Sequence, residues 1–156
     1  MKFDKPELFL GKQADSDVIM TLMRELDLGN RVSIKRDEMD AHLNNFKKGI
    51  SLLFESERYA HARHGIELPT DAPVLISIFL YGAENDEFSP FAGELINGLT
   101  FSDGRTDALN KLGPSKGYDE YFNSETWDFP EGFLLYVDYS EDKSKISLVQ
   151  YQVIFK

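Results

Sequence analysis

The stretch Gly132-Phe133-Leu134-Leu135-Tyr136-Val137-Asp138-Tyr139 decides the fold that we predict for this chain. Its alternating large apolar residues are typical of a strand that turns one face to a core. A related stretch, Gly49–Ser56, reads Gly-Ile-Ser-Leu-Leu-Phe-Glu-Ser and lies 83 residues earlier. At this offset the apolar positions coincide, and Asp138 falls on Glu55. We interpret the two stretches as equivalent strands in two copies of one unit.

A second similarity supports the repeat. Residues 76–81 align with residues 146–151 at an offset of 70. The change of offset predicts a 13-residue insertion in the first unit, which we place in the loop 57–69. The predicted organisation is a first unit over residues 1–82, an acidic connector over residues 83–94 and a second unit over residues 95–156.

Each predicted unit is a helix followed by a small antiparallel sheet. Apolar residues at helical spacing predict a first helix over Ser16–Leu26, and a second helix over Gly104–Leu112 would be capped by Ser102 or Asp103. Residues 31–35 alternate like a short strand, whereas residues 37–48 fit either a strand or a helical turn. The fold class is therefore α+β, with two tandem helix-plus-antiparallel-sheet units that form one continuous sheet or two apposed sheets.

Composition restricts the location and chemistry of the protein. The 156 residues include no cysteine, which excludes disulfides and thiolate metal sites. The start shows no signal peptide, and no run of about 18 apolar residues is long enough to span a bilayer. We expect a soluble cytoplasmic protein without a membrane association.

Negative charge is concentrated in the second half of the chain. The net charge of −10 divides into −2 for residues 1–82 and −8 for residues 83–156. Such a distribution attracts a basic partner over long range, although acidic surfaces also serve solubility alone. Nucleic-acid binding is disfavoured because Lys and Arg cluster only at 35–36 and 47–48.

The second unit resembles the repeat of the beta-lactamase inhibitory protein fold and of small outer-membrane assembly lipoproteins. The matching positions are Gly98, Asp103, Leu112-Gly113-Pro114, Trp127, Leu135-Val137-Tyr139 and Ile146–Val149. The resemblance covers residues 95–155 well and residues 8–81 loosely, and it concerns structural residues, so it implies fold more than function. A cytoplasmic, acidic chain with two such units looks like the bacterial immunity proteins that neutralise polymorphic or contact-dependent toxins. The lack of a signal peptide argues against the secreted relatives.

Aromatic rings interleaved with acids mark the predicted partner-binding residues. Rings supply contact area and acids supply orientation toward a cationic protein. The alternative is that Tyr121 or Phe122 packs beneath the sheet. The predicted residues lie in a loop, in the connector and on a strand: Tyr118, Asp119, Glu120, Tyr121 and Phe122; Glu84, Asp86, Glu87 and Phe88; and Tyr136, with Leu134 on the same strand face.

Other chemistries find little support in the sequence. His61 and His64 with Glu57 would share one helical face, but the neighbouring Arg58 and Arg63 make a solvated loop the better interpretation than a metal site. No nucleophile elbow or phosphate loop is present, so we predict no enzyme, no cofactor and no metal. The predicted function is an immunity protein that neutralises a cognate, basic toxin. The alternatives are an assembly module of an envelope or secretion system and a small carboxylate-dependent hydrolase.

Overall fold

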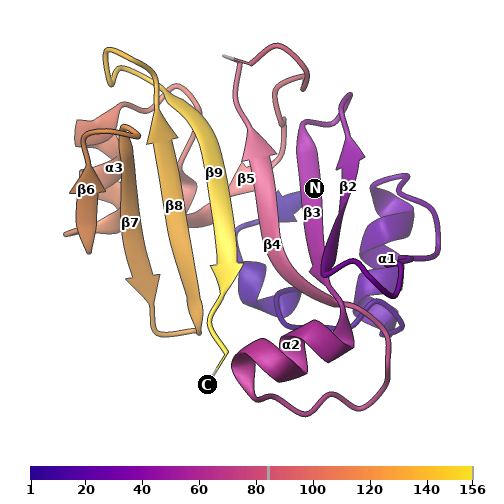
Figure 1. The fold of residues 1–156 in the computed structure, drawn as a ribbon. Coiled ribbons are helices and arrows are strands. Elements are labelled where there is room, and N and C mark those ends of the chain that lie inside the picture. The colour runs from indigo at the N-terminus through magenta and orange to yellow at the C-terminus, as the bar shows by residue number, and fades with distance from the viewer. Residues whose placement is uncertain (84, 156) are drawn as a thin grey trace.

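A seven-stranded antiparallel sheet is the framework of the computed structural model, which describes residues 1–83 and 85–155 (Figure 1). Its strand order is β2-β3-β4-β9-β8-β7-β6, and a parallel pair, β1 and β5, lies apart from it. The strands are β1 (Lys2–Phe3), β2 (Asp40–Asn45), β3 (Ile50–Glu55), β4 (Val74–Tyr81), β5 (Glu94–Leu95), β6 (Gly117–Asp119), β7 (Ser124–Phe129), β8 (Phe133–Tyr139) and β9 (Ile146–Val153). The helices are α1 (Asp17–Glu25), α2 (Glu57–His64) and α3 (Arg105–Leu112), with 3₁₀ turns η1 (Pro6–Leu8) and η2 (Ile96–Gly98).

The predicted α+β class is confirmed, and the sheet is continuous rather than split in two. In each half of the chain a helix precedes three strands: α1 precedes β2, β3 and β4, and α3 precedes β7, β8 and β9. The halves join where β4 and β9 pair antiparallel, from Ser77 opposite Gln152 to Tyr81 opposite Leu148. The short strand β6 extends the second half by one further strand.

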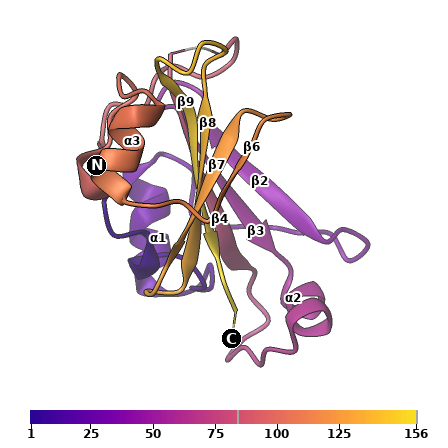
Figure 2. The same cartoon turned by 90° about the vertical axis from the view of Figure 1, so that its left-hand side faces the viewer.

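Helices α1 and α3 cover one face of the sheet, which we call the core face (Figure 2). Ser16 caps the start of α1, because its side chain accepts a hydrogen bond from the N–H of Ile19. The helix buries Ile19, Leu22 and Met23 against this face, as their helical spacing predicted. The matching face of β8 buries Phe133, Leu135 and Val137, and that of β3 buries Ile50, Leu52 and Phe54.

The opposite face of the sheet is covered at one end by α2, which lies in front of the strands in Figure 1. This helix lies within the predicted insertion. Ser56 caps its first turn, and Gly65, with a φ of 68°, ends it in the left-handed conformation that glycine adopts without strain. Ala60 packs there on Val74 and Ile76 of β4.

Three details of the sequence interpretation are wrong. The offset of 70 aligns Ile78 with Leu148, but Ile78 lies on the core face opposite Tyr151, whereas Leu148 lies on the other face opposite Tyr81. Residues 31–35 form no strand, although Val32 and Ile34 pack against the core. Gly104, not Asp103, precedes α3, because the Asp103 carboxylate accepts hydrogen bonds from Thr100 N–H and Lys111 Nζ instead.

The segment between the halves is packed into the fold. Phe91 is buried beside Phe3, with ring centroids 5.7 Å apart, and Lys2–Phe3 pairs with Glu94–Leu95. Gly49, in the β2–β3 turn, leaves no space for a side chain, because a Cβ there would lie 2.1 Å from Ser89 O. Residues 89–94 of the connector therefore pack closely against the first half of the chain.

Candidate protein-binding surface

Among residues 1–83 and 85–155, the sheet face opposite α1 and α3 carries a helix only at its α2 end, and we call the remainder the open face. Figure 1 looks onto this face. Because side chains of directly paired residues point to the same side, the strand register fixes the neighbours on it. One row crosses four strands from Tyr81 to Leu148, Asp138 and Ser124. The next row runs from Phe79 to Gln150, Tyr136 and Thr126.

Residues on these two rows are partly exposed, in contrast to the buried core face. Tyr136, a predicted binding residue, belongs to the second row, between Gln150 and Thr126. Leu134 lies two residues before Tyr136 on β8, opposite Gln152. Aromatic, aliphatic and amide groups thus alternate over the open face, a composition that suits a protein interface better than a solvated surface.

The two loops predicted to bind lie at the same end of the sheet. Strand β4 runs toward that end and leads into the connector, and β7 starts there after the β6–β7 turn. Their end residues, Tyr81 and Ser124, belong to one row across the sheet. Three strand spacings separate β4 from β7, which places the loops roughly 15 Å apart.

Tyr121 and Phe122 form an exposed aromatic pair in the β6–β7 turn, which we call the aromatic tip. Their side chains are 88% and 70% exposed, and the rings meet edge to face with centroids 4.8 Å apart. The alternative that one of them packs beneath the sheet is therefore wrong. Asp119 Oδ1 accepts the N–H groups of both residues, so the tip is held in one conformation. Glu120 lies exposed beside them.

Asn123 fastens the aromatic tip to the sheet. Its Nδ2 donates to the carbonyl oxygens of Tyr139 and Ser140, and its Oδ1 accepts from Tyr118 Oη. The backbone of Asn123 takes a φ of 53°, a conformation that asparagine tolerates better than most residues. The ring of Tyr118 lies under Arg105, 4.3 Å from the guanidinium carbon. Tyr118 thus supports the tip and contacts cations of its own chain, and its role in binding a partner stays a prediction.

In the connector, Phe88 stacks on Tyr81 with ring centroids 3.8 Å apart and an angle of 5° between the planes. Phe46, 46% exposed, lies on the other side of Phe88 at 4.7 Å. These three rings form an aromatic cluster that sequence reasoning missed, because Phe46 and Phe88 are remote in the chain. Asp86 and Glu87 are exposed beside the cluster, and Glu84 lies outside the described residues.

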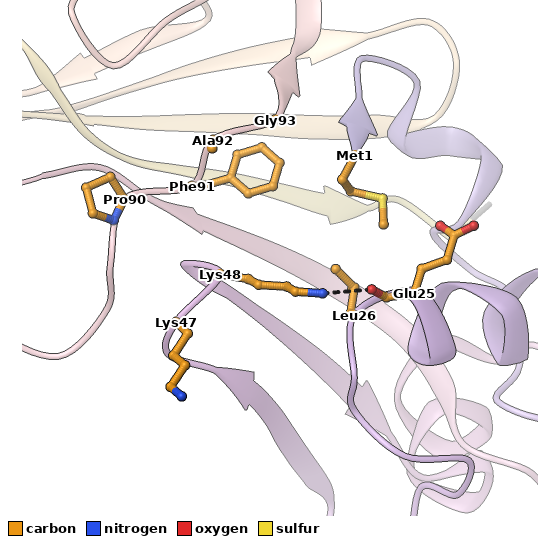
Figure 3. A pocket seen from close by; sticks show the side chains of 9 residues that line it. All are labelled: Met1, Glu25, Leu26, Lys47, Lys48, Pro90, Phe91, Ala92 and Gly93. Atoms are coloured by element: carbon orange, nitrogen blue, oxygen red, sulfur yellow. Dashed lines mark hydrogen bonds between the residues drawn. The ribbon is translucent and has the colours of Figure 1, made fainter.

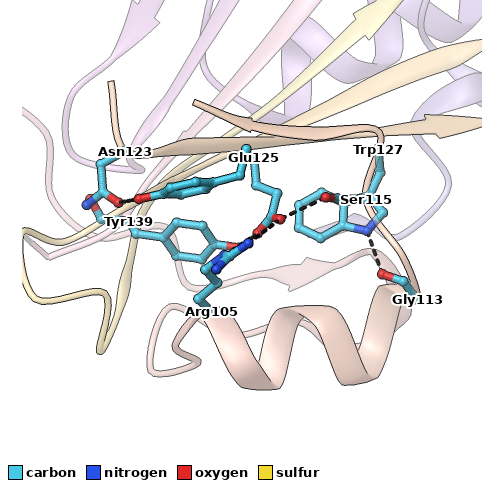
Figure 4. A network of polar contacts seen from close by, with 8 residues as sticks. Arg105, Gly113, Ser115, Asn123, Glu125, Trp127 and Tyr139 are labelled. Carbon is cyan, nitrogen blue, oxygen red and sulfur yellow. Dashed lines mark hydrogen bonds and ion pairs between the residues drawn. The ribbon is translucent and has the colours of Figure 1, made fainter. Parts of the chain in front are cut away.

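A buried polar network lies between α3 and the strands β7 and β8 (Figure 4). Glu125, 1% exposed, accepts two hydrogen bonds from Arg105 at 3.0 and 3.1 Å, one from Ser115 Oγ and one from Tyr139 Oη. Burial alone would raise the pKa of Glu125, but these donors outweigh it and hold the pKa below its usual value. The network joins α3 to β7 and β8, and Trp127 Nε1 adds a bond to Gly113 O.

The histidines do not gather as a metal site would require. His61 Nδ1 faces the carbonyl of Ile66, whereas His64 Nε2 approaches Glu55. Within residues 1–83 and 85–155, no three His, Asp or Glu side chains are grouped to hold a metal ion. Across the same residues, no helix has the length and apolar character needed to cross a bilayer.

A hollow of about 430 Å³ lies on the core side, between the β2–β3 turn and the N-terminus (Figure 3). Lys48 reaches into it and donates to Glu25 O, and it also pairs with Asp27 at 3.1 Å. The wall contains Phe91 and Leu26, which belong to the core. Apart from Glu25, no carboxylate lines this hollow within the described part of the chain, so it offers no pair for acid–base chemistry.

Comparison with known proteins returned no similarity: no family model, no curated protein and no solved structure matched the chain. The function must therefore be argued from the surface itself.

Proposed function

We propose that this protein is a cytoplasmic immunity protein that neutralises a basic bacterial toxin by binding it, without chemical turnover. One observation carries the proposal: the aromatic tip and the cluster of Phe46, Tyr81 and Phe88 flank one end of an open sheet face. Exposed and partly exposed rings that pack on one another around a partly apolar surface are what a tight protein interface needs.

The negative charge of the proposed binding surface indicates a positively charged partner. Residues 117–145, which supply the tip and most of the second half of the face, contain eight acidic and two basic residues, a net charge of −6. One of these acids, Glu125, is neutralised by Arg105 within the fold. The remaining excess favours encounter with a cationic protein through long-range attraction.

The proposal predicts that a toxin-like domain is encoded beside this gene, and the test uses that domain. Its expression alone should arrest growth, and co-expression of the full chain should restore it and yield a stable stoichiometric complex. An unrelated toxin of a different class serves as the control and should not be neutralised. The absence of such a neighbouring domain, or continued toxicity despite co-expression, would contradict the proposal. Several unrelated stable partners would support the assembly module instead.

A further inference from the structure

Asp138 lies on the open face near the end of β8, between Leu148 of β9 and Ser124 of β7. It is partly buried, yet within the described residues no hydrogen bond or ion pair reaches its carboxylate. A shift of register follows it, between Asp138 and Tyr139. Such bulges change the direction in which a neighbouring side chain points.

Other partly or fully buried carboxylates of the second half have partners. Glu125 has Arg105, Ser115 and Tyr139, and Asp103 has Lys111 at 2.7 Å. Asp138 differs from them because burial raises its pKa without any compensating donor. A desolvated, unpaired carboxylate weakens the fold at neutral pH, whereas an incoming cation would recover that free energy.

The neighbours of Asp138 supply the rest of a cation site. Tyr136 lies two residues away on the same face, and Tyr81 follows beyond Leu148 in the same row. Aromatic faces attract ammonium and guanidinium groups, most strongly where water is partly excluded. The aliphatic side chain of Leu148 fits the methylene stem of a long basic residue.

We propose that Asp138 binds an arginine or lysine side chain of the protein partner, which enters the open face between Tyr81 and Tyr136. The inference rests on the proposed function for the identity of that partner, but the cation site itself does not. The acid, in the row of residues that joins the two loops, would fix the orientation of the partner, while the rings of those loops supply contact area.

The test is an NMR titration of the ¹⁵N-labelled full chain with N-acetyl-arginine methylamide at low salt. The neutral citrulline analogue is the control ligand, and N-acetyl-lysine methylamide tells the two cations apart. We expect saturable shifts at the amides of Ser124, Asp138 and Leu148 with a cation and none with citrulline. Asp138→Asn should weaken binding at least fivefold. Asp128→Asn is the same change at an exposed site on the neighbouring strand β7, two rows away on this face. It should change the affinity less than twofold.

Equal shifts with citrulline, or unchanged binding by Asp138→Asn with its spectrum intact, would overturn the inference. A failure of the cation site can be distinguished from a failure of the proposed function. If the toxin is neutralised and Asp138→Asn binds it as tightly as the native chain, the cation site is wrong and the function stands. If the arginine probe binds at Asp138 but no toxin is neutralised, the site stands and the function is wrong.

Discussion

Glu55 Oε1 lies 3.2 Å from His64 Nε2 and joins β3 to the last turn of α2. The carboxylate is 1% exposed, and its other oxygen lies 3.6 Å from Arg63 Nη1. Burial raises the pKa of Glu55, and the nearby His64 and Arg63 offset this only in part, while Asp40 on β2 adds to the rise. The ionised form of Glu55 is therefore less favourable in the folded protein than in the unfolded chain.

The raised pKa of Glu55 determines how this residue affects the pH dependence of the free energy of unfolding. A raised folded-state pKa stabilises the fold below the unfolded pKa of about 4.5, and that stabilisation is lost as pH rises through the folded value. Glu55→Gln removes the titration. The free energy of unfolding of the variant minus that of the native protein should increase with pH from about 4.5 upward. Urea unfolding at several pH values measures it, and a difference that stays constant or decreases would contradict the assignment.

Arg105→Ala should destabilise the protein by about 2 kcal/mol, because it leaves the buried Glu125 without its cation. The cost stays below that of a fully buried pair, since Arg105 is 37% exposed. The lowered pKa of Glu125 means that its contribution is present at neutral pH and is lost as pH falls below about 4.5. The variant should therefore lose less stability in acid than the native protein. Thr106→Ala, an exposed change on the same helix, is the control for urea unfolding.

Replacement of Tyr121 and Phe122 by Ala should leave the free energy of unfolding within about 0.5 kcal/mol, because both side chains are largely exposed. If the aromatic tip binds the toxin, each substitution should speed dissociation by a factor corresponding to about 2 kcal/mol. Surface plasmon resonance measures the rate. Leu8→Ala, at an exposed apolar residue in the N-terminal turn, should leave it unchanged. Unaltered dissociation from both tip variants would place the interface elsewhere.

Substitutions of Asp119 and Glu120 should distinguish effects on the rate of association with the toxin from effects on the rate of dissociation. Asp119→Asn with Glu120→Gln keeps an oxygen that can accept the N–H groups of Tyr121 and Phe122, but removes two charges. We expect slower association with a weaker salt dependence and an unchanged dissociation rate. Asp119→Ala deletes the acceptor, so it should also speed dissociation because the tip loses its fixed conformation. Equal dissociation rates for the Asn and Ala variants would show that the turn does not depend on this bond.

The sequence predicted the parts of the fold that depend on local patterns. The helical spacing of Ile19, Leu22 and Met23 located α1, and the apolar stretch Phe133–Tyr139 located β8. The offset of 70 failed because similar apolar strands also match out of register. The equivalent strand residues Leu52 and Leu135 pair with Ile78 and Tyr151, so Ile78 corresponds to Tyr151, and the odd slip to Leu148 reverses the face that a side chain occupies.

The candidate surface was predicted in part for the same reason. Alternating rings and acids indicated that the β6–β7 turn and the connector are exposed loops, because the composition of such loops can be recognised from the local sequence. The stacking of Phe88 on Tyr81 and the unpaired carboxylate of Asp138 depend on residues distant in the chain. Both features arise from the packing of distant segments in the folded sheet, which no local sequence pattern predicts.

The pairing of β4 with β9 has a consequence for synthesis. Strand β4 pairs with β3 along one edge, but its second partner, β9, is made only after β6, β7 and β8, since Ile78 also pairs with Tyr151. While the chain is still growing, the apolar strand Val74–Tyr81 has an open edge that can pair with another nascent chain. The centre of the sheet is therefore the last part to close, and the growing chain most needs protection by chaperones during that interval.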